Sequence, residues 1–308
     1  MALKIIFMGT PEFSVPILES IHNSKHNILE VYTQPPKKKN RGQSINLTPV
    51  HKFAKENNIK ARCPENIDTE VEIENLKQKN PDVVVVVAYG KILPTKLLDT
   101  DKIQFINIHA SLLPKWRGAA PIQRSIMNLD SETGISVMKI IPKLDAGPVM
   151  MKSIVKITKN TNYKKLSQEL STLGAKKILE SLDLIEKNSA NFLDQNEKDA
   201  SYAKKIDKSE SKIEWNTEAK KVIAKINALY PNPGSWFKYN DSRLKIIKAI
   251  EVKIKGIPGE ILDKNFTIAC SENAIQILEI QKEGKRSMKV SDYLKGNTLQ
   301  VGLNVRKS

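Results

Sequence analysis

Residues 107–122, NIHASLLPKWRGAAPI, join the end of an apolar strand to a helix, and this junction decides the fold. In the preceding run, IQFINIH at 103–109, alternation places Asn107 and His109 on one face of the predicted strand. The two polar side chains therefore arrive together at its carboxyl end. SLLP then predicts a tight turn with apolar walls, and Pro121 begins the next predicted helix.

Upstream of this junction, apolar strands alternate with helical stretches. The strands are predicted at 3–9, 27–33, 83–88 and 103–109. Continuous β-branched runs separated by helices are typical of parallel strands buried on both faces. We therefore expect an α/β fold with a doubly wound, mostly parallel, Rossmann-like sheet, which holds ligands at the carboxyl ends of its strands.

The last third of the chain has a different pattern. A lysine-rich helix at about 162–187 precedes residues 190–206, which are polar, lack periodicity and predict a linker. We expect a catalytic domain at 1–189 and a basic second domain at 207–308. Short strands in the second domain favour a small OB-like β-barrel; they are SWFKYN (235–240), RLKIIKAIEVKI (243–254), GEILD (259–263), FTIACS (266–271) and AIQILEI (274–280).

The formal charge of +16 is distributed unevenly. Residues 203–308 hold 21 Lys and Arg against 12 Asp and Glu, so this part is about twice as basic per residue as the rest. Basic clusters gain affinity for a phosphate backbone by releasing its counterions, which predicts a polyanionic partner. A lysine-rich solvated surface is the alternative.

Composition also predicts what the protein lacks. The longest apolar run, VVVVVAYG at 83–90, is far shorter than the roughly 20 residues that span a membrane, and MALKIIFMG has no signal-peptide pattern. We expect a cytoplasmic protein with no membrane partner. Cys63 and Cys270 are distant and the four histidines are scattered, so neither a disulfide framework nor a metal site is expected.

Asp145 is a third polar candidate. It lies in LDAGPV (144–149), a turn between two strand-like stretches. A carboxylate beside an imidazole fixes its tautomer and favours its charged form, which is the arrangement that acid–base catalysis uses. Taken alone, Asp145 is better explained as an ordinary turn aspartate that bonds its own backbone, and Asn107 and His109 are equally well explained as caps of a strand.

Several motifs together resemble the 10-formyltetrahydrofolate-dependent formyltransferases. They are FMGTPEF (7–13), VVVVAYGKILP (84–94), NIHASLLPKWRGAAPIQRSI (107–126), ETGISVMKI (132–140) and LDAGPV (144–149). In the second domain, NPGSWF, IPGEIL and MKVSDYLKGN resemble the carboxyl-terminal barrel found in that family. The resemblance covers nearly the whole chain.

The resemblance implies a function and a site. The donor would be 10-formyltetrahydrofolate, used as a co-substrate, and the acceptor the α-amino group of methionine on an initiator tRNA. Asn107, His109 and Asp145 correspond to the catalytic residues of the family. Asn107 and a protonated His109 would donate hydrogen bonds to the developing oxyanion, while Asp145 holds His109. The folate pocket would be lined by Ser111, Leu112, Leu113 and Pro114.

A basic loop follows the second predicted strand, TQPPKKKNRGQSINLTPVHK at 33–52. The resemblance implies that this loop approaches the acceptor end of the tRNA, while the basic second domain holds the acceptor arm. Ser44 and Ile45 stand where lysines are common in the family. The alternative is a solvated tip without a partner. The basic residues concerned are Lys37, Lys38, Lys39 and Arg41.

Two other functions stay open at this level. A formyltransferase or formyl-folate hydrolase with a small acceptor would share Asn107, His109 and Asp145, but it would need neither the basic loop nor the basic domain. A noncatalytic RNA-binding protein would fit the charge and the fold, but it would not need all three polar residues. We expect the protein to be a monomer.

Overall fold

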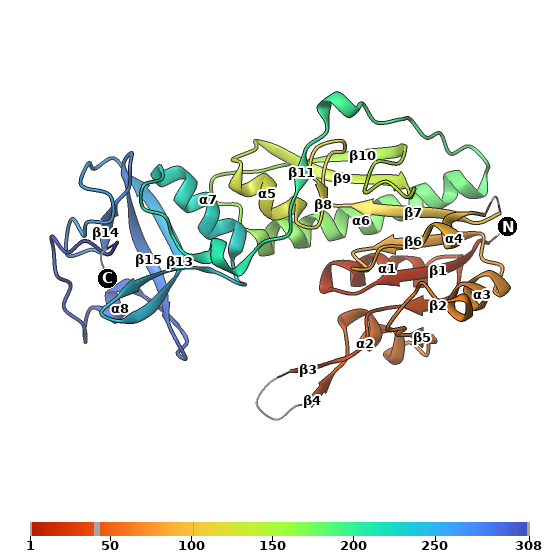
Figure 1. Cartoon of the computed structure of the whole chain (residues 1–308), viewed down its shortest axis with the longest axis horizontal. Helices are drawn as coiled ribbons and strands as arrows, with labels where there is room; N and C mark the ends of the chain where they lie inside the picture. The colour runs from red at the N-terminus through yellow and green to blue at the C-terminus, as the bar shows by residue number, and fades with distance from the viewer. Residues whose placement is uncertain (1, 40–43, 101, 307–308) are drawn as a thin grey trace. The chain divides into compact units, whose positions relative to one another are not determined.

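The computed structural model describes residues 2–39, 44–100 and 102–306, and the chain forms two compact units (Figure 1). The first unit comprises residues 1–118, 133–155 and 167–203, and the second comprises 119–132, 156–166 and 204–308. Two early segments therefore group with the last third of the chain. The domains expected from the sequence, 1–189 and 207–308, place residues 119–132 and 156–166 in the first domain.

The first unit is built on a mostly parallel sheet. Among the described residues its seven strands run in the order β10-β9-β7-β6-β1-β2-β5. β5, β2, β1, β6 and β7 pair in parallel, whereas β9 is antiparallel to β7. The expected doubly wound, mostly parallel sheet is confirmed. The strands are β1 (Lys4–Gly9), β2 (Asn27–Tyr32), β5 (Ala61–Arg62), β6 (Val83–Val87), β7 (Gln104–His109), β9 (Glu132–Lys139) and β10 (Val149–Lys156).

Helices cover both faces of this sheet. Gly174 lies beside Ile17 and Ile108, so α6 and α1 cover the face of the sheet to which Ile108 of β7 points. On the other face, a core cluster joins side chains of α3 and α4 to Phe105 of β7. The helices are α1 (Val15–His22), α2 (Pro49–Glu56), α3 (Glu70–Gln78), α4 (Thr95–Leu98) and α6 (Tyr163–Glu186), with 3-10 turns at Glu12–Ser14 and Glu197–Asp199.

Local chemistry explains where several helices begin. The side chain of Thr48 accepts a hydrogen bond from the amide of His51 at the start of α2, and Pro49 follows the cap. Thr69 caps α3 in the same way through the amide of Glu72. Such caps satisfy amides that have no partner inside the helix. Short two-stranded pairs complete the unit: β3 (Lys37–Lys39) with β4 (Ser44–Asn46), and β8 (Arg117–Gly118) with β11 (Tyr202–Ala203).

The second unit contains a curled antiparallel sheet. Its five described strands pair in the order β12-β13-β15-β14, and β16 also pairs with β15. The ring of Phe237 lies edge-on to those of Trp215 and Phe266 in its core. The elements are α5 (Pro121–Met127), a 3-10 turn (Lys208–Ser211), α7 (Ala219–Leu229), β12 (Ser235–Tyr239), β13 (Ser242–Val252), β14 (Thr267–Ala269), β15 (Ala274–Lys282), β16 (Ser287–Lys289) and α8 (Val290–Tyr293).

One expected strand of this unit is wrong. Residues 259–263 form only isolated bridges, of Glu260 with Asn304 and of Ile261 with Ile268. Gly259, with φ of +89°, follows a proline that has no amide hydrogen, and both features interrupt a strand. The fifth strand of the sheet is β16, which pairs with β15.

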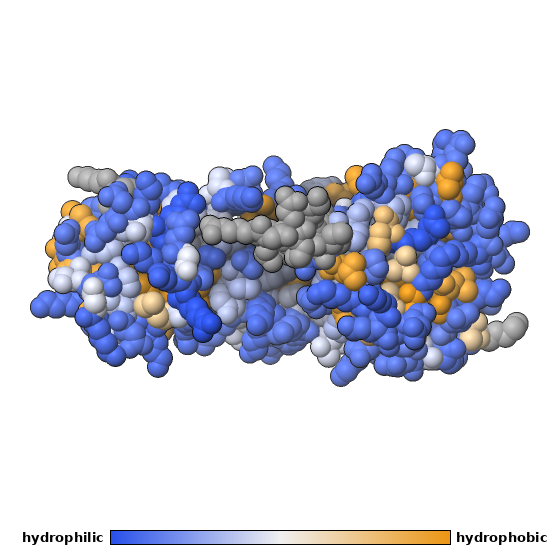
Figure 2. All heavy atoms as spheres, turned by 90° about the horizontal axis from the view of Figure 1, so that it is seen from below, coloured by the Kyte–Doolittle hydropathy of each residue, from blue (hydrophilic) through white to orange (hydrophobic). Residues whose placement is uncertain are grey.

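Among the described residues, no helix has both the length and the hydropathy that crossing a bilayer requires. Figure 2 shows one face, on which hydrophilic residues predominate and apolar ones occur in small groups. Scattered apolar side chains of this kind are normal on a protein surface.

Candidate active site

The candidate site lies at the carboxyl edge of the parallel strands. Here the loops that follow β1, β2 and β6 are tied together. The hydroxyl of Thr10 donates to the carbonyl of Tyr89 at 2.8 Å, and the side-chain Nε2 atom of Gln34 donates to the carbonyls of Tyr89 and Gly90. β7 ends at His109 beside these loops, at the edge where such sheets bind ligands.

Asn107 presents an unoccupied amide at this edge. Its side chain is half-buried on the face of β7 that also carries Phe105. Within residues 2–39, 44–100 and 102–306, no hydrogen bond to this side chain occurs. A half-buried amide without a protein partner is available to donate to a ligand.

His109 lies between two hydrogen-bond acceptors. Its side chain is only 6% exposed. The Nε2 atom lies 2.9 Å from the carbonyl oxygen of Trp116, and the Nδ1 atom lies 3.6 Å from Oδ2 of Asp145. A carbonyl can only accept, so Nε2 carries the proton of that bond. A carboxylate oxygen faces Nδ1, so an acceptor lies near each ring nitrogen.

Asp145 reaches His109 because its loop folds back along β7. β9 is antiparallel to β7, and its last residue, Lys139, lies opposite Ile106. The loop from 140 to 148 returns from that level to His109. Asp145 itself has a left-handed φ of +45°, and its side chain is 16% exposed.

The amide of Gly118 holds the carboxylate of Asp145 in place. This amide donates to Oδ2 at 2.8 Å. Gly118 has φ of +119°, and a Cβ atom here would lie 2.9 Å from the carbonyl oxygen of Ala203. A side chain at this position would therefore be strained and would collide with the neighbouring backbone. Glycine keeps the amide where Asp145 needs it.

The loop expected to line a folate pocket is held firmly from below. Ser136 accepts the amide of Leu113 and donates to the carbonyl of Ser111. Leu113 is fully buried against Met138 and Val149, so its side chain supports the loop rather than facing a ligand. The half-buried members of the loop, Leu112 and Pro114, offer the exposed apolar surface.

Residues 190–203, expected to be part of a linker, pack against the site. Leu193 exchanges two backbone hydrogen bonds with Val149. The side-chain amide of Gln195 donates to the carbonyls of Asp145 and Gly147. Ser201 accepts the backbone amide of Trp116. The linker expectation is thus wrong for this segment, because its many polar side chains are used to bind the loops of the site.

Arg117 is a second residue that sequence reasoning missed. Its guanidinium is completely buried, and it donates to Gln195 and to both carboxylate oxygens of Glu197. Hydrogen bonding to Arg117, assisted by Lys143, lowers the pKa of Glu197 to about 2. The sequence signal was an arginine between Trp116 and the small residues of GAAP (118–121).

The structure covers only part of the basic loop. The backbone of Lys37, Lys38 and Lys39 forms β3, which pairs with β4. Arg41 lies outside the described residues. The role of this loop in tRNA binding therefore stays a prediction.

One group of possible metal ligands occurs in the part of the chain that the structure describes: His26, Asp183 and Glu186. Lys25 already pairs with both carboxylates, at 3.0 Å from Asp183 and 2.5 Å from Glu186. The Nδ1 atom of His26 accepts the amide of Leu3. A lysine cation thus fills the place that a metal ion would take, and the group is explained as an ion-pair cluster.

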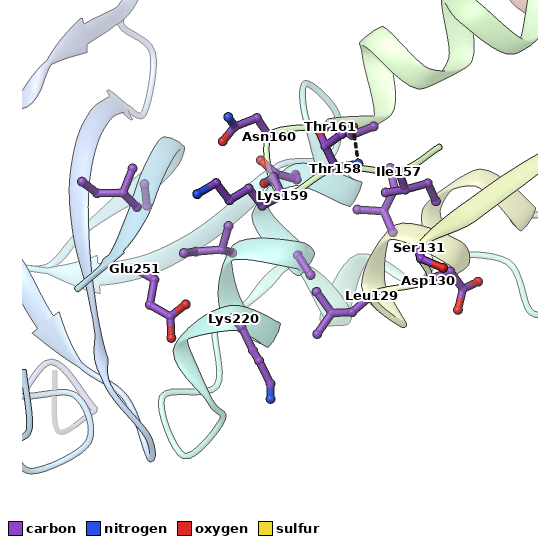
Figure 3. Close-up of a pocket in the computed structure, with 16 residues that line it drawn as sticks. Leu129, Asp130, Ser131, Ile157, Thr158, Lys159, Asn160, Thr161, Lys220 and Glu251 are labelled. Atoms are coloured by element: carbon purple, nitrogen blue, oxygen red, sulfur yellow. Dashed lines mark hydrogen bonds between the residues drawn. The ribbon is translucent and has the colours of Figure 1, made fainter. Parts of the chain in front are cut away.

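A cavity of about 420 Å³ lies within the second unit, and it contains none of the candidate residues. Figure 3 shows the loop around Thr158 and Thr161 facing the helix that carries Lys220. The polar groups on its wall largely satisfy one another: Thr158 bonds Thr161, and Asn227 donates to the carbonyl of Lys159. It presents no grouping suited to catalysis.

Sequence comparisons agree with this geometry. Residues 3–182 match the model of a family described as formyl transferase, and residues 205–298 match the model of its C-terminal domain. The methionyl-tRNA formyltransferase of Pelagibacter ubique (strain HTCC1062) is 47% identical over 307 residues, which cover 99% of this chain and 99% of the relative.

Solved structures show the same fold. An N-formyltransferase from Helicobacter canadensis, in complex with folinic acid and dTDP-3-aminofucose, has a TM-score of 0.68 at 22% identity, with 92% of this chain and 100% of that chain covered. HypX from Aquifex aeolicus, in complex with tetrahydrofolic acid, has a TM-score of 0.66 at 16% identity; 98% of this chain is covered, but only 51% of HypX. At such identities the likeness extends to the fold alone.

Proposed function

Because this chain belongs to the formyl transferase family, and within it to the methionyl-tRNA formyltransferases, we propose that Asn107, His109 and Asp145 carry its chemistry. The chain transfers a formyl group to the methionine of initiator methionyl-tRNA, the first aminoacyl-tRNA of translation. The observation that supports the site is the convergence of the three side chains at the carboxyl edge of β7, with His109 held between two acceptors.

The donor is a folate, and 10-formyltetrahydrofolate is the form we propose. When bound, it supplies a formyl group on N10. A bond forms between the methionine nitrogen and the formyl carbon, the N10–carbon bond breaks, and one proton passes from the amine to N10. The amine attacks in its neutral form, and a free α-amino group has a pKa of about 7.7 to 8. Asp145 is the carboxylate placed to assist that proton transfer.

Asn107 and His109 stabilise the negative charge of the tetrahedral intermediate. The amide of Asn107 has no competing partner among the described residues, so it is ready to donate. Nε2 of His109 bonds the carbonyl of Trp116 at 2.9 Å in this state, so its donation to the oxyanion replaces that bond. Each such donor is typically worth about 2.7 to 4 kcal/mol of transition-state stabilisation.

The folate pocket is proposed along the loop from Ser111 to Pro114. Support comes from the position of this loop directly after β7 and from the half-buried side chains of Leu112 and Pro114. Replacing Leu112 by Asp would place a carboxylate against the ligand and weaken folate binding. Leu113 is unsuitable for this test, because its substitution would disturb the buried cluster with Met138 and Val149.

The tRNA partner accounts for the charge of the second unit. Its basic residues are proposed to hold the acceptor arm through phosphate contacts, and Lys37 to Arg41 to approach the acceptor end. A small-acceptor transferase or a formyl-folate hydrolase would not need this basic surface, and the family match does not favour a noncatalytic RNA-binding protein. A monomer in the cytoplasm remains the expectation.

One assay tests the proposed function. Purified protein is mixed with 10-formyltetrahydrofolate and charged initiator tRNA, and formylmethionine is quantified after hydrolysis of the ester. A parallel reaction contains a free amino sugar nucleotide as a small acceptor. We expect product only with the tRNA. Product with the small acceptor alone, or release of formate without transfer, would replace this function by one of the alternatives.

A further inference from the structure

Gln195 connects the catalytic loop to a buried arginine. It lies in the 190–203 segment, far along the chain from the residues it contacts. On one side its Oε1 atom accepts from Nε and Nη2 of Arg117, at 3.1 and 2.9 Å. On the other side its Nε2 atom donates to the carbonyls of Asp145 and Gly147, at 2.9 and 2.7 Å.

Only an amide satisfies both sides of this position. Toward Arg117 the side chain must accept, because a guanidinium has donors only. Toward Asp145 and Gly147 it must donate, because main-chain carbonyls only accept. A carboxylate here would repel the carbonyls of Asp145 and Gly147. An ammonium group would repel the guanidinium of Arg117. The four contacts therefore determine both the residue type and the orientation of its amide.

Arg117 is itself fixed on all sides. The side chain is completely buried, and Glu197 binds it through both carboxylate oxygens at 2.9 and 3.2 Å. Its backbone amide donates to the carbonyl of Ser201, and Arg117 lies opposite Tyr202 where β8 pairs with β11. A guanidinium held in this way has one orientation, so it holds Gln195 in one orientation.

The carboxylate of Asp145 depends on the backbone that Gln195 holds. The loop from 140 to 148 turns through the left-handed conformation of Asp145, and Gln195 binds the carbonyl of Asp145 itself and that of Gly147, two residues later. The side chain of Asp145 is bound by Gly118, which directly follows Arg117 in the chain. Backbone and carboxylate of Asp145 are thus both fixed by groups that Arg117 organises.

We infer that Gln195 is a positioning residue for the His109–Asp145 pair, and that Arg117 acts through Gln195. Gln195 does not touch His109 and takes no part in proton transfer. It keeps the carboxylate of Asp145 at 3.6 Å from Nδ1 of His109. This inference rests on the proposed function only in assigning catalysis to that pair.

The test replaces Gln195 by Glu, which keeps the acceptor for Arg117 and loses the donor to the loop. Gln195→Met, which loses both, is the second variant. The matched control is Gln168→Glu, the same change at an exposed position on α6. We expect both Gln195 variants to lower kcat by about ten- to a hundredfold, with KM values for folate and tRNA within about threefold. The control is expected to keep the kcat of the wild type.

Combination with Asp145→Ala separates positioning from a general structural defect. If Gln195 acts through Asp145, then Gln195→Glu adds less than about threefold to the loss that Asp145→Ala already causes. Losses that multiply would overturn the assignment, and so would normal kcat in Gln195→Glu. Circular dichroism checks folding. Unfolding of both Gln195 variants would also overturn it, since Gln195 would then serve the fold as a whole.

A readout without turnover keeps this inference separate from the proposed function. In protein with carbon-13-labelled histidine, the ring signal of His109 is assigned by its loss in His109→Ala. We expect that signal to shift in Gln195→Glu and to stay in place in Gln168→Glu. A shift in a protein that transfers no formyl group would reject the function and leave the positioning role standing. If the His109 signal is unchanged in Gln195→Glu while the wild type formylates normally, the proposed function stands and the positioning role of Gln195 is rejected.

Discussion

The Oδ2 atom of Asp145 lies 3.6 Å from the Nδ1 atom of His109, while the carbonyl of Trp116 lies 2.9 Å from Nε2 of the same ring. The imidazole is therefore held from both ends by groups that accept hydrogen bonds. One of these acceptors carries a negative charge, and the ring is almost fully buried. Nε2 therefore carries a proton that can be donated to a reacting oxygen when its bond to the carbonyl of Trp116 is exchanged.

Removing either member of this pair should abolish most of the activity. We expect His109→Ala and Asp145→Ala each to lower kcat by about two to four powers of ten, because each change removes the oriented proton donor. The double variant should be little slower than the slower single variant. Single-turnover formylation with saturating folate and initiator tRNA measures the effect. Near-normal rates in a folded single variant would contradict the assignment.

Asn107 should contribute to the transition state without contributing to folding. Its amide has no protein partner among the described residues, so Asn107→Ala leaves no buried group unsatisfied. We expect kcat to fall by about a hundred- to a thousandfold, the usual cost of losing one oxyanion donor. The unfolding temperature should stay close to that of the wild type. Gln104→Ala, at an exposed position of the same strand, is the matched control and should be fully active.

Salt dependence should reveal the phosphate contacts of the second unit. Lys238 on β12 pairs with Arg243 on β13, and Lys245 lies on the same face opposite Trp236. Arg243 also stacks over the Trp236 ring at 4.3 Å. We expect alanine at the three basic positions to weaken initiator and elongator tRNA alike.

Measuring tRNA affinity at several salt concentrations also tests how many phosphate contacts are lost. In plots of the logarithm of affinity against that of salt concentration, each lost phosphate contact should reduce the slope by about one. Lys96→Ala, at an exposed position on α4, is the control. A slope that does not change in the triple variant would show that this face of the sheet does not contact phosphates.

Arg41 should affect the choice of tRNA more than its binding. The residue lies outside the described part of the chain, and the prediction rests on the basic run from Lys37 to Arg41 in the sequence. We expect Arg41→Ala to reduce formylation of initiator tRNA and to narrow its advantage over elongator methionyl-tRNA. Rates on both tRNAs measure this advantage. If rates and ratio both stay unchanged, the run is a solvated tip.

Acid should loosen the 190–203 segment through Glu197. Hydrogen bonding to Arg117 lowers the pKa of Glu197 to about 2, whereas an unfolded glutamate has a pKa of about 4.3. The stabilisation is therefore complete above about pH 4.3 and is lost as the pH falls toward 2.

Thermal unfolding of wild type and Glu197→Gln between pH 7 and 2.5 checks this prediction. The difference in unfolding temperature should be constant down to about pH 5 and should shrink below it. Glu169→Gln, at an exposed position of α6, serves as the control. A difference that persists unchanged at pH 2.5 would show that the charge of Glu197 is not what holds the segment.

The sequence by itself determined the architecture of the first unit, and the reason is local. Buried parallel strands leave continuous apolar runs, and those runs located β1, β2, β6 and β7 to within a residue or two. Alternation along β7 placed Asn107 and His109 on one face, where the structure has them. The family motifs were continuous in sequence, so the family could be recognised without coordinates.

Only the tertiary structure decided how the site is supported. The acceptor at Nε2 of His109 is a main-chain carbonyl of Trp116, and a carbonyl leaves no trace in residue identity. Gln195 stands in a polar stretch without periodicity, and its partners are distant in sequence. Strand and helix patterns arise from neighbours along the chain, whereas a hydrogen bond between remote segments requires only one suitable side chain at one place. Such contacts form only when the chain has folded. Here, residues 190–203, expected to be part of a linker, contact the loop of Asp145 through Gln195.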